Sequence, residues 1–236
     1  MASKARIKRF IATTVVATAL FVSGVDVAFA GTAKDMIVVV PEGTAKPAAL
    51  STHVANWRQQ IGASNVVWVD SLKRDKPSGF ASMAVLNFSD PKQLKAWKKA
   101  NATALSTPVE VVAANALARG GIASKSEPMY KISYYKLTSP RKDIQAWVDG
   151  YLKKYLDAQV ENDILTRYAM YLEEGKEGRL LLVLEYTDAA IEQNAEPIKA
   201  KLSEDIARVD AEYARQSGLK ESLRVTQSWT LAVPTN

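Results

Sequence analysis

The sequence predicts an α+β protein in which the order strand–helix–strand–strand–helix–strand occurs twice. Segments rich in β-branched residues or with alternating polarity recur between segments whose apolar residues have helical spacing. A short string also recurs at the same place in both halves, VLNFSD at residues 85–90 and VLEYTD at residues 183–188, with an offset of 98 residues. The agreement of element order and string predicts a tandem duplication.

The first half begins with a β-branched strand at residues 36–40, which ends at a Pro-Glu-Gly turn. A helix is expected to open at Pro47. Its apolar residues are spaced by four, three and four positions, which places them on one face; they are Leu50, Val54, Trp57 and Ile61. Further strands are expected at residues 65–70 and 80–88, joined as a hairpin across residues 73–79. A second helix after Ser89-Asp90-Pro91 and a strand at residues 109–117 complete the half.

The second half follows the same order. Residues 129–137 form the first predicted strand, and a helix follows Ser139-Pro140. The apolar face of that helix contains Ile144, Trp147, Val148, Tyr151, Leu152 and Tyr155. The remaining expected elements are strands at 164–172 and 179–186, a helical region at 189–217 and a strand at 223–233.

Residues 1–30 have the three parts of a cleavable export signal. Four basic residues precede an apolar run at residues 10–22, and the small residues Ala28 and Ala30 fit a signal peptidase site, so cleavage is expected after Ala30. The apolar run is shorter than the ~20 residues of a membrane-spanning helix, so no stable membrane anchor is expected after cleavage. We therefore predict a periplasmic or secreted protein, with halves at 31–119 and 129–236 and a linker at 120–128.

Charge and composition exclude several classes of partner and site. The chain has 31 basic and 25 acidic residues, and removal of the signal subtracts four basic and one acidic, which leaves 27 against 24, or +3. The remaining charges are interleaved, so no nucleic-acid partner is expected. The absence of cysteine and the presence of one histidine exclude zinc and iron–sulfur sites, and no metal is predicted.

The repeated βαββαβ order over residues 35–233 resembles the ferredoxin-like fold of the dimeric α/β-barrel superfamily. The resemblance implies a pseudo-dimeric α/β barrel, in which one chain supplies two antiparallel sheets that pack face to face around a cavity. Members of the superfamily include cofactor-free monooxygenases, degradation enzymes and haem proteins, so the fold does not choose a function. Haem-binding members place their ligand in the second repeat, where this sequence has no histidine, and no cofactor is therefore expected.

The second half concentrates residues that suit a small apolar or aromatic ligand. All nine tyrosines lie there, and Tyr134 shares a strand face with Tyr130 and Ile132. Glu185 is the polar exception on an apolar strand, and Arg167 on the preceding strand could pair with it. The candidate ligand-binding residues are His53, Trp68, Tyr134, Arg167, Tyr168, Glu185 and Gln227. The competing interpretation is that the tyrosines are core residues and that Arg167 and Glu185 form a surface pair.

Motifs for catalysis are weak. His53 lies beside the apolar face of the first helix, where it is either a general base or haem ligand or a boundary residue. Ser89 and Ser139 begin Ser-x-x-Lys strings, but each precedes a helix and is expected to cap it. Three hypotheses remain. The first is an exported protein that binds a small apolar or aromatic ligand in a cavity between the two sheets. The others are a cofactor-free monooxygenase-type enzyme and an envelope interaction module that uses a sheet face or the charged helix at 199–215.

Overall fold

The computed structural model describes residues 34–72, 79–101, 105, 109–124, 127–175 and 178–235. The predicted export signal and most of the predicted hairpin turn at 73–79 lie outside these residues. No helix among the described residues is long and apolar enough to cross a membrane.

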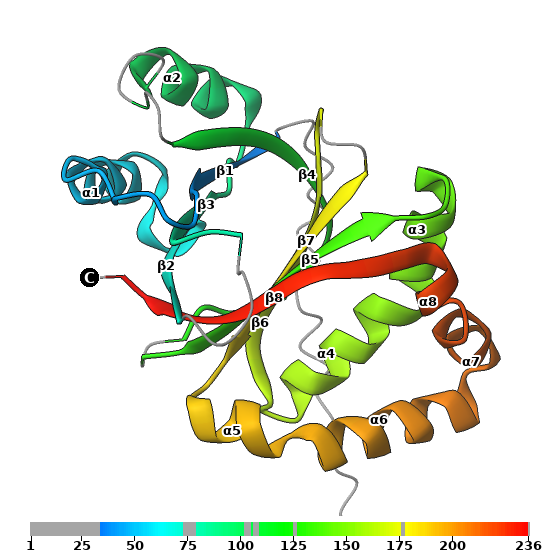
Figure 1. Cartoon of the computed structure of the whole chain (residues 1–236). Coiled ribbons are helices and arrows are strands. Elements are labelled where there is room, and N and C mark those ends of the chain that lie inside the picture. Colours follow the sequence, from blue (N-terminus) through cyan, green and yellow to red (C-terminus); the bar gives the residue numbers. More distant parts are fainter. Residues whose placement is uncertain are drawn as a thin grey trace, which may run out of the picture. The chain divides into compact units, whose positions relative to one another are not determined.

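Eight antiparallel strands in the described residues close into a barrel (Figure 1). In chain order they are β1 Asp35–Val40, β2 Val66–Leu72, β3 Ser82–Leu86, β4 Glu110–Gly121, β5 Met129–Leu137, β6 Leu165–Glu173, β7 Arg179–Tyr186 and β8 Arg224–Pro234. Their order around the barrel is β1-β3-β2-β8-β5-β7-β6-β4. Each half contributes a four-stranded ferredoxin-like sheet, β4-β1-β3-β2 and β8-β5-β7-β6, as the repeated element order predicts.

The two sheets meet at β2–β8 and at β4–β6, and the pairing at the two seams is equivalent. Ala114 on β4 lies opposite Glu173 on β6, and Ala232 on β8 lies opposite Ser71 on β2. Ala114 and Ala232 each also pair with the first strand of their own half. The halves are thus joined in matching register, while their origin by duplication stays a prediction.

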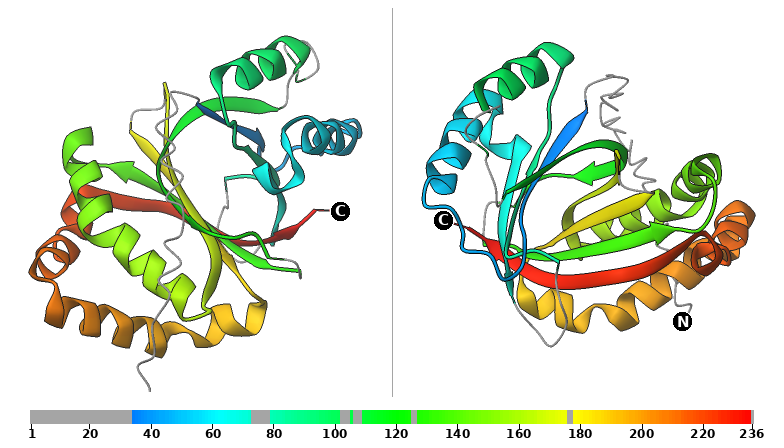
Figure 2. Two further views of the ribbon diagram at one scale, coloured as in Figure 1. Left: turned by 180° about the vertical axis from the view of Figure 1, so that it is seen from behind. Right: turned by 45° about the horizontal axis from the view of Figure 1, so that its top comes forward.

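Helices cover the outer faces of both sheets (Figures 1 and 2). The first sheet is covered by α1 Leu50–Ile61 and α2 Pro91–Asn101, with a short 3₁₀ turn, η1 Ala63–Asn65, before β2. On the second half, α3 Arg141–Trp147, the π-helical turn η2 Val148–Leu152 and α4 Lys153–Glu161 form one helical run. The other helices of this half are α5 Ala189–Asn194, α6 Glu196–Val209, α7 Ala211–Ser217 and α8 Lys220–Leu223.

Three apolar clusters follow from this arrangement. One lies between the first sheet and its helices, and there the predicted face of α1 is confirmed because Leu50, Val54, Trp57 and Ile61 are all buried. A second lies between the second sheet and its helices. The third contains residues from all eight strands and fills the barrel interior. Because successive residues of a strand point to opposite faces, alternate positions belong to the interior and to the outer face.

Several element boundaries differ from the predicted ones. The helix α1 begins at Leu50, because Pro47 instead forms a turn in which its carbonyl accepts a hydrogen bond from Leu50 N. The strand β4 continues to Gly121, so the first two residues of the predicted linker 120–128 belong to the sheet. This extension requires glycine at position 120, because the Cβ of any other residue would lie only 2.5 Å from the ring of Tyr168.

The two predicted serine caps are also corrected. The side chain of Asp90, and not that of Ser89, accepts the backbone N–H groups at the start of α2, while Ser89 donates to Gln93. Ser139 does not cap α3, because its hydroxyl contacts the carbonyl of Ser222.

Candidate functional site

The structure places the predicted site residues on different surfaces. Arg167 and Glu185 point into the barrel because they share a strand face with residues of the interior cluster, and Tyr134 is itself a member of that cluster. Tyr168 follows Arg167 directly and therefore points outward, where its hydroxyl donates to Asp157 Oδ1 at 2.6 Å. The prediction that Arg167 and Tyr168 line the same site is therefore wrong.

The three other candidates also lie away from the interior. Trp68 is buried in the outer cluster of the first half, with Lys46 Nζ 4.2 Å from its ring centroid. His53 on α1 is half-buried and stacks on Trp57 at 6.2 Å, which favours the boundary-residue interpretation. Gln227, predicted as a polar group amid apolar neighbours on the last strand, is exposed and lies at a β-bulge that shifts the β5–β8 register.

Glu185 and Arg167 form a buried ion pair at one end of the barrel. The two residues are opposite each other on β7 and β6, and Arg167 donates to Glu185 Oε2 from Nη2 at 2.5 Å and from Nε at 2.9 Å. Only 2% of the Glu185 side chain is exposed. The predicted pairing is therefore confirmed, and the surface-pair interpretation is wrong.

Further donors satisfy the Glu185 carboxylate. Tyr130, opposite Glu185 on β5, donates from its hydroxyl at 3.0 Å, and Thr166 donates from its hydroxyl at 2.9 Å. The backbone N–H of Ser124 adds a hydrogen bond at 2.6 Å. Burial and the nearby Glu185 carboxylate raise the pKa of Tyr130 well above its ordinary value, so its hydroxyl keeps its proton.

A second ion pair joins Asp35 and Arg119 at the same end. Asp35 is the first residue of β1 and is 2% exposed; it pairs with Arg119 and accepts the backbone N–H of Phe88 at 3.3 Å. Burial raises the pKa of Asp35 to about 6, although the Arg119 charge and the Phe88 N–H oppose this shift. This carboxyl group therefore changes charge close to neutral pH.

Tyr171 lies between the two pairs. Its hydroxyl donates to Asn87 Oδ1 at 2.9 Å, and the Arg119 guanidinium lies 5.4 Å from its ring centroid. Burial raises its pKa, while Arg119 and Arg167 oppose the shift. We call the complete set the polar cluster: Asp35, Asn87, Arg119, Tyr130, Arg167, Tyr171 and Glu185.

The two arginines of the polar cluster are neighbours on one face. Arg119 on β4 lies opposite Ala169 on β6, two residues after Arg167, so the side chains are diagonal neighbours. Their side chains are 24% and 20% exposed, whereas those of Asp35 and Glu185 are nearly inaccessible. The two guanidinium groups are thus partly exposed at the barrel end, and the buried carboxylates of Asp35 and Glu185 hold them in place.

The opposite end of the interior carries another arginine–carboxylate pair. Arg179 donates to Glu173 Oε2 at 2.6 Å, and its guanidinium lies 4.8 Å from the ring centroid of Tyr134. Burial and the Glu173 charge raise the pKa of Tyr134. Tyr134 is therefore separated from the polar cluster by the apolar residues of the interior.

The sequence-based candidates did not include five members of the polar cluster, namely Asp35, Asn87, Arg119, Tyr130 and Tyr171. Tyr130 was placed on the correct face but was not chosen, and Asp35 was left outside the predicted strand. Arg119 fell at the edge of the predicted linker, because the strand was expected to end at residue 117. Tyr171 carries the one usable signal, since it is four residues after Arg167 and so on the same face of a strand.

Metal chemistry finds no support from side-chain clustering. Within the described ranges, no group of three or more His, Cys, Asp or Glu residues could hold a metal ion. The expectation that the protein binds no cofactor stays a prediction.

Comparison with known proteins identifies the fold. No protein-family model and no curated protein sequence matches the chain. Among solved structures, a provisionally assigned monooxygenase from Lactobacillus acidophilus NCFM matches with a TM-score of 0.52 and 10% identity over 86% of this chain and 92% of that chain. An anthrone oxidase-like protein matches with a TM-score of 0.51 and 6% identity over 86% and 91%.

A provisionally assigned monooxygenase from Fusobacterium nucleatum subsp. nucleatum ATCC 25586 also matches, with a TM-score of 0.51 and 9% identity over 86% of this chain and 90% of that chain. At identities this low, the structural matches establish the architecture but not the activity. The strand order, the closed barrel and these matches agree. The chain therefore has the dimeric α/β-barrel fold, with both ferredoxin-like sheets supplied by one polypeptide.

Proposed function

We propose that the protein binds a small aromatic molecule with an acidic oxygen at the barrel end that carries the polar cluster. The observation that carries this proposal is that Arg167 is partly exposed and does not use all of its N–H donors within the protein. A guanidinium has five N–H donors, and Arg167 uses three of them, two toward Glu185 and one toward the Ser64 carbonyl at 2.9 Å. Tyr130 also forms a side-chain hydrogen bond with Arg167, so at least one donor remains on a side chain that is one-fifth exposed.

The surroundings of Arg167 favour an anionic aromatic ligand. The contacts to Glu185 and Ser64 hold the guanidinium in place, so little conformational entropy is lost when it binds an oxyanion. Arg119 lies diagonally beside it, and Ile122 at the same end of the barrel is 84% exposed and offers an apolar surface. The described interior is filled with apolar side chains, which favours the barrel end over its middle as the binding place.

Calorimetric titration with 1-naphthoate tests this proposal, with the neutral 1-naphthylmethanol as the matched probe. The double variant Arg167→Met/Glu185→Gln removes both charges of the pair while it keeps a hydrogen-bond acceptor for Tyr130. We expect naphthoate binding that is about ten- to a hundredfold weaker in the variant, as for loss of a charge-assisted hydrogen bond. Equal binding of both probes, or unchanged binding by the variant, contradicts the proposal.

A second candidate function is a cofactor-free oxygenase acting at the same site. It is favoured by the neighbours with this fold, two of them provisionally assigned as monooxygenases and one named an anthrone oxidase-like protein. Deprotonation of anthrone gives a carbanion whose charge is delocalised onto oxygen, where Arg119 and Arg167 would stabilise it. Reaction with O2 then yields anthraquinone and water, which balances one anthrone and one O2.

Oxygen uptake with anthrone separates this candidate from binding alone. The enzyme hypothesis predicts one O2 consumed for each anthraquinone formed, at a rate that depends on protein and falls in Arg167→Met/Glu185→Gln. A rate equal to that of buffer, together with tight naphthoate binding, leaves the binding function and removes the oxygenase.

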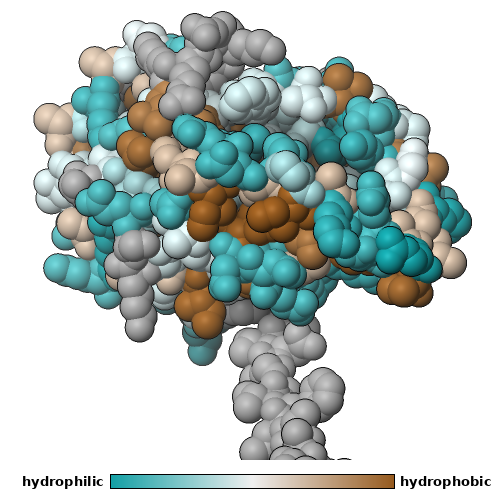
Figure 3. Space-filling view, turned by 90° about the horizontal axis from the view of Figure 1, so that it is seen from below, coloured by the Kyte–Doolittle hydropathy of each residue, from teal (hydrophilic) through white to brown (hydrophobic). Residues whose placement is uncertain are grey.

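The third hypothesis, an interaction module built on the charged helix, has less support. On α6, Lys201 and Arg208 both pair with Asp205, so these charges are satisfied within the helix. Ile198 and Val209 are exposed. Seen from the side on which α5 and α6 lie, hydrophobic residues gather in small groups surrounded by hydrophilic ones (Figure 3).

We also propose that the protein acts outside the cytosol, in a periplasm or the medium. The support is the pattern of residues 1–30, and a nucleic-acid partner is not part of the proposal because the charge after cleavage is only +3. Mass spectrometry of protein recovered from the cell envelope should give a chain that begins at Gly31. Recovery of the uncleaved chain from the cytosol contradicts export.

A further inference from the structure

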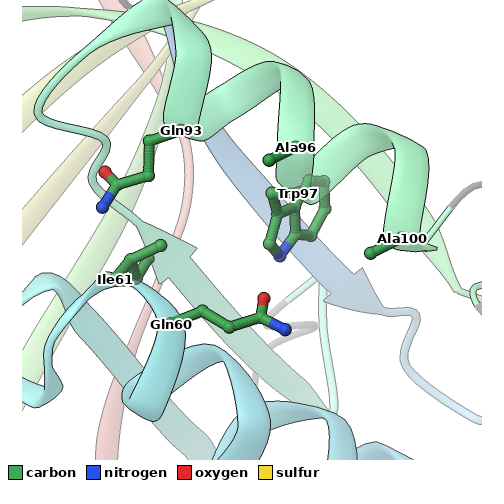
Figure 4. Close-up of a pocket in the computed structure, with 6 residues that line it drawn as sticks. All are labelled: Gln60, Ile61, Gln93, Ala96, Trp97 and Ala100. Atoms are coloured by element: carbon green, nitrogen blue, oxygen red, sulfur yellow. The ribbon is translucent and has the colours of Figure 1, made fainter.

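A groove between α1 and α2 lies on the outer face of the first half, away from the polar cluster (Figure 4). Its volume is about 360 Å³, at the lower end of the range for small-molecule sites. The lining residues are Gln60, Ile61, Gln93, Ala96, Trp97 and Ala100. Neither the proposed function nor the barrel interior makes use of this groove.

Trp97 brings an unpaired hydrogen-bond donor to the groove. The residue is 3% exposed and is fixed by edge-on contacts with Trp57 and Phe88, at 5.5 and 5.8 Å between ring centroids. Its Nε1 is buried and has no acceptor in the described part of the chain, whereas Nε1 of Trp57 donates to Asn101 at 3.0 Å. Figure 4 shows the Trp97 indole nitrogen directed toward α1, beside Gln60. A buried N–H without an acceptor is unfavourable, and a bound oxygen would satisfy it.

The two glutamines add donors rather than acceptors. The carbonyl oxygen of Gln93 already accepts from the backbone N–H and the hydroxyl of Ser89, at 3.0 and 3.1 Å, which leaves its NH2 group for another partner. Gln60 is exposed, and its side chain lies next to the Trp97 indole nitrogen. Because that nitrogen is buried, a ligand reaches it only when the Gln60 side chain moves aside.

The charge at the groove is positive. Lys92 and Lys99 are exposed and are i−4 and i+3 neighbours of Ala96, so they border the groove on its solvent side. Neither lysine has an ion-pair partner among the residues that the structure describes, and α1 and α2 contain no acidic residue. The nearest carboxylate in sequence, Asp90, accepts backbone N–H groups at the start of α2.

We propose that this groove is a second binding site, for a small organic anion with an apolar body. Its carboxylate accepts a hydrogen bond from Trp97 Nε1, and its apolar body lies along Ile61, Ala96 and Ala100. Lys92 and Lys99 supply the charge complementarity. The site is independent of the polar cluster, because it lies on the outer face of the first sheet.

Indole NMR signals give a direct test with octanoate as the probe and the neutral 1-octanol as its matched control. The chain has five tryptophans, and the Trp97 indole signal is assigned with Trp97→Phe. Octanoate should shift the Trp97 signal in a saturable way and leave those of Trp68 and Trp147 unchanged, since their Nε1 atoms are also buried and unpaired but do not line the groove. An absent shift, an equal shift with octanol, or equal shifts of all three signals overturns the proposal.

Variants at exposed positions complete the test without disturbing the core. Ala96→Leu/Ala100→Leu fills the groove and should weaken octanoate binding about tenfold or more, whereas Ala55→Leu, on the exposed side of α1, should not change it. Lys92→Gln/Lys99→Gln should weaken binding about two- to fivefold. Arg167→Met/Glu185→Gln should leave octanoate binding intact, which separates this site from the proposed function. Unchanged binding in Ala96→Leu/Ala100→Leu contradicts the assignment of the groove.

Discussion

Glu185 and Arg167 face each other across β7 and β6 inside the barrel, with Arg167 Nη2 2.5 Å from Glu185 Oε2. Arg167 also reaches the carbonyl of Ser64, which belongs to the other half of the chain. The pair therefore links the two halves of the chain at the barrel end where Arg167 is partly exposed. Stability and ligand binding should depend on the same contacts.

Removal of one partner from this pair should be much more costly than removal of both charges. Arg167→Met leaves the Glu185 carboxylate buried without its cation, and we expect a loss of about 3–5 kcal/mol in the free energy of unfolding. Arg167→Met/Glu185→Gln should lose clearly less, since no uncompensated charge remains. Urea denaturation of both variants measures the difference. Equal losses in the two variants would show that the ion pair does not determine stability here.

Asp35 should contribute to the pH dependence of stability, and its contribution should decrease as the pH rises. Its pKa is about 6 in the folded protein against an ordinary value of 3.8, so the folded state binds this proton more tightly than the unfolded state does. The stabilisation is complete below about pH 4 and is lost as the pH rises through 6, by about 3 kcal/mol in total.

Comparison of the wild-type protein with Asp35→Asn isolates this contribution, because the other titrating groups are common to both. The free energy of unfolding of the wild type, relative to the variant, should fall between pH 4 and pH 7. A rise over the same range would mean that Arg119 lowers the pKa of Asp35 below its ordinary value, which contradicts a raised pKa in the folded protein.

Gly120 should tolerate no side chain while Tyr168 is present. A Cβ at position 120 would lie 2.5 and 2.7 Å from ring atoms of Tyr168 and 2.8 Å from its hydroxyl oxygen, which is held by Asp157. Gly120→Ala should cost about 1–3 kcal/mol, the usual range for overpacking. Thermal unfolding measures this loss, with Gly218→Ala as the control because its nearest neighbour would be 3.6 Å away. In the background of Tyr168→Leu the same Gly120→Ala change should cost less.

The fold could be predicted from the sequence because both halves give the same local signals. Apolar spacing in α1 and the β-branched run of β1 are strong local features, and their repetition indicates the paired sheets. The seams β2–β8 and β4–β6 could not be predicted, because they depend on which sheet edges meet in space. The end of β4 was missed because its extension rests on the contact between Gly120 and Tyr168.

The candidate site could be predicted only in part. Arg167 and Glu185 lie on successive predicted strands and could be expected to pair, but strand alternation places Tyr168 on the opposite face from Arg167. Gln227 does not belong to the site because it is exposed at a β-bulge, and the sequence gives no clear signal for a bulge at this position. Asp35 and Arg119 meet only when β1 and β4 pair, so no local pattern indicates their contact.

The most direct measurement is a crystal structure of the protein lacking residues 1–30, in the presence of a saturating concentration of 1-naphthoate. We expect the ligand at the barrel end, with a carboxylate oxygen about 3 Å from a terminal nitrogen of Arg167 and the rings near Ile122. Ligand found only in the groove between α1 and α2, or none at a concentration that saturates binding in solution, would contradict it.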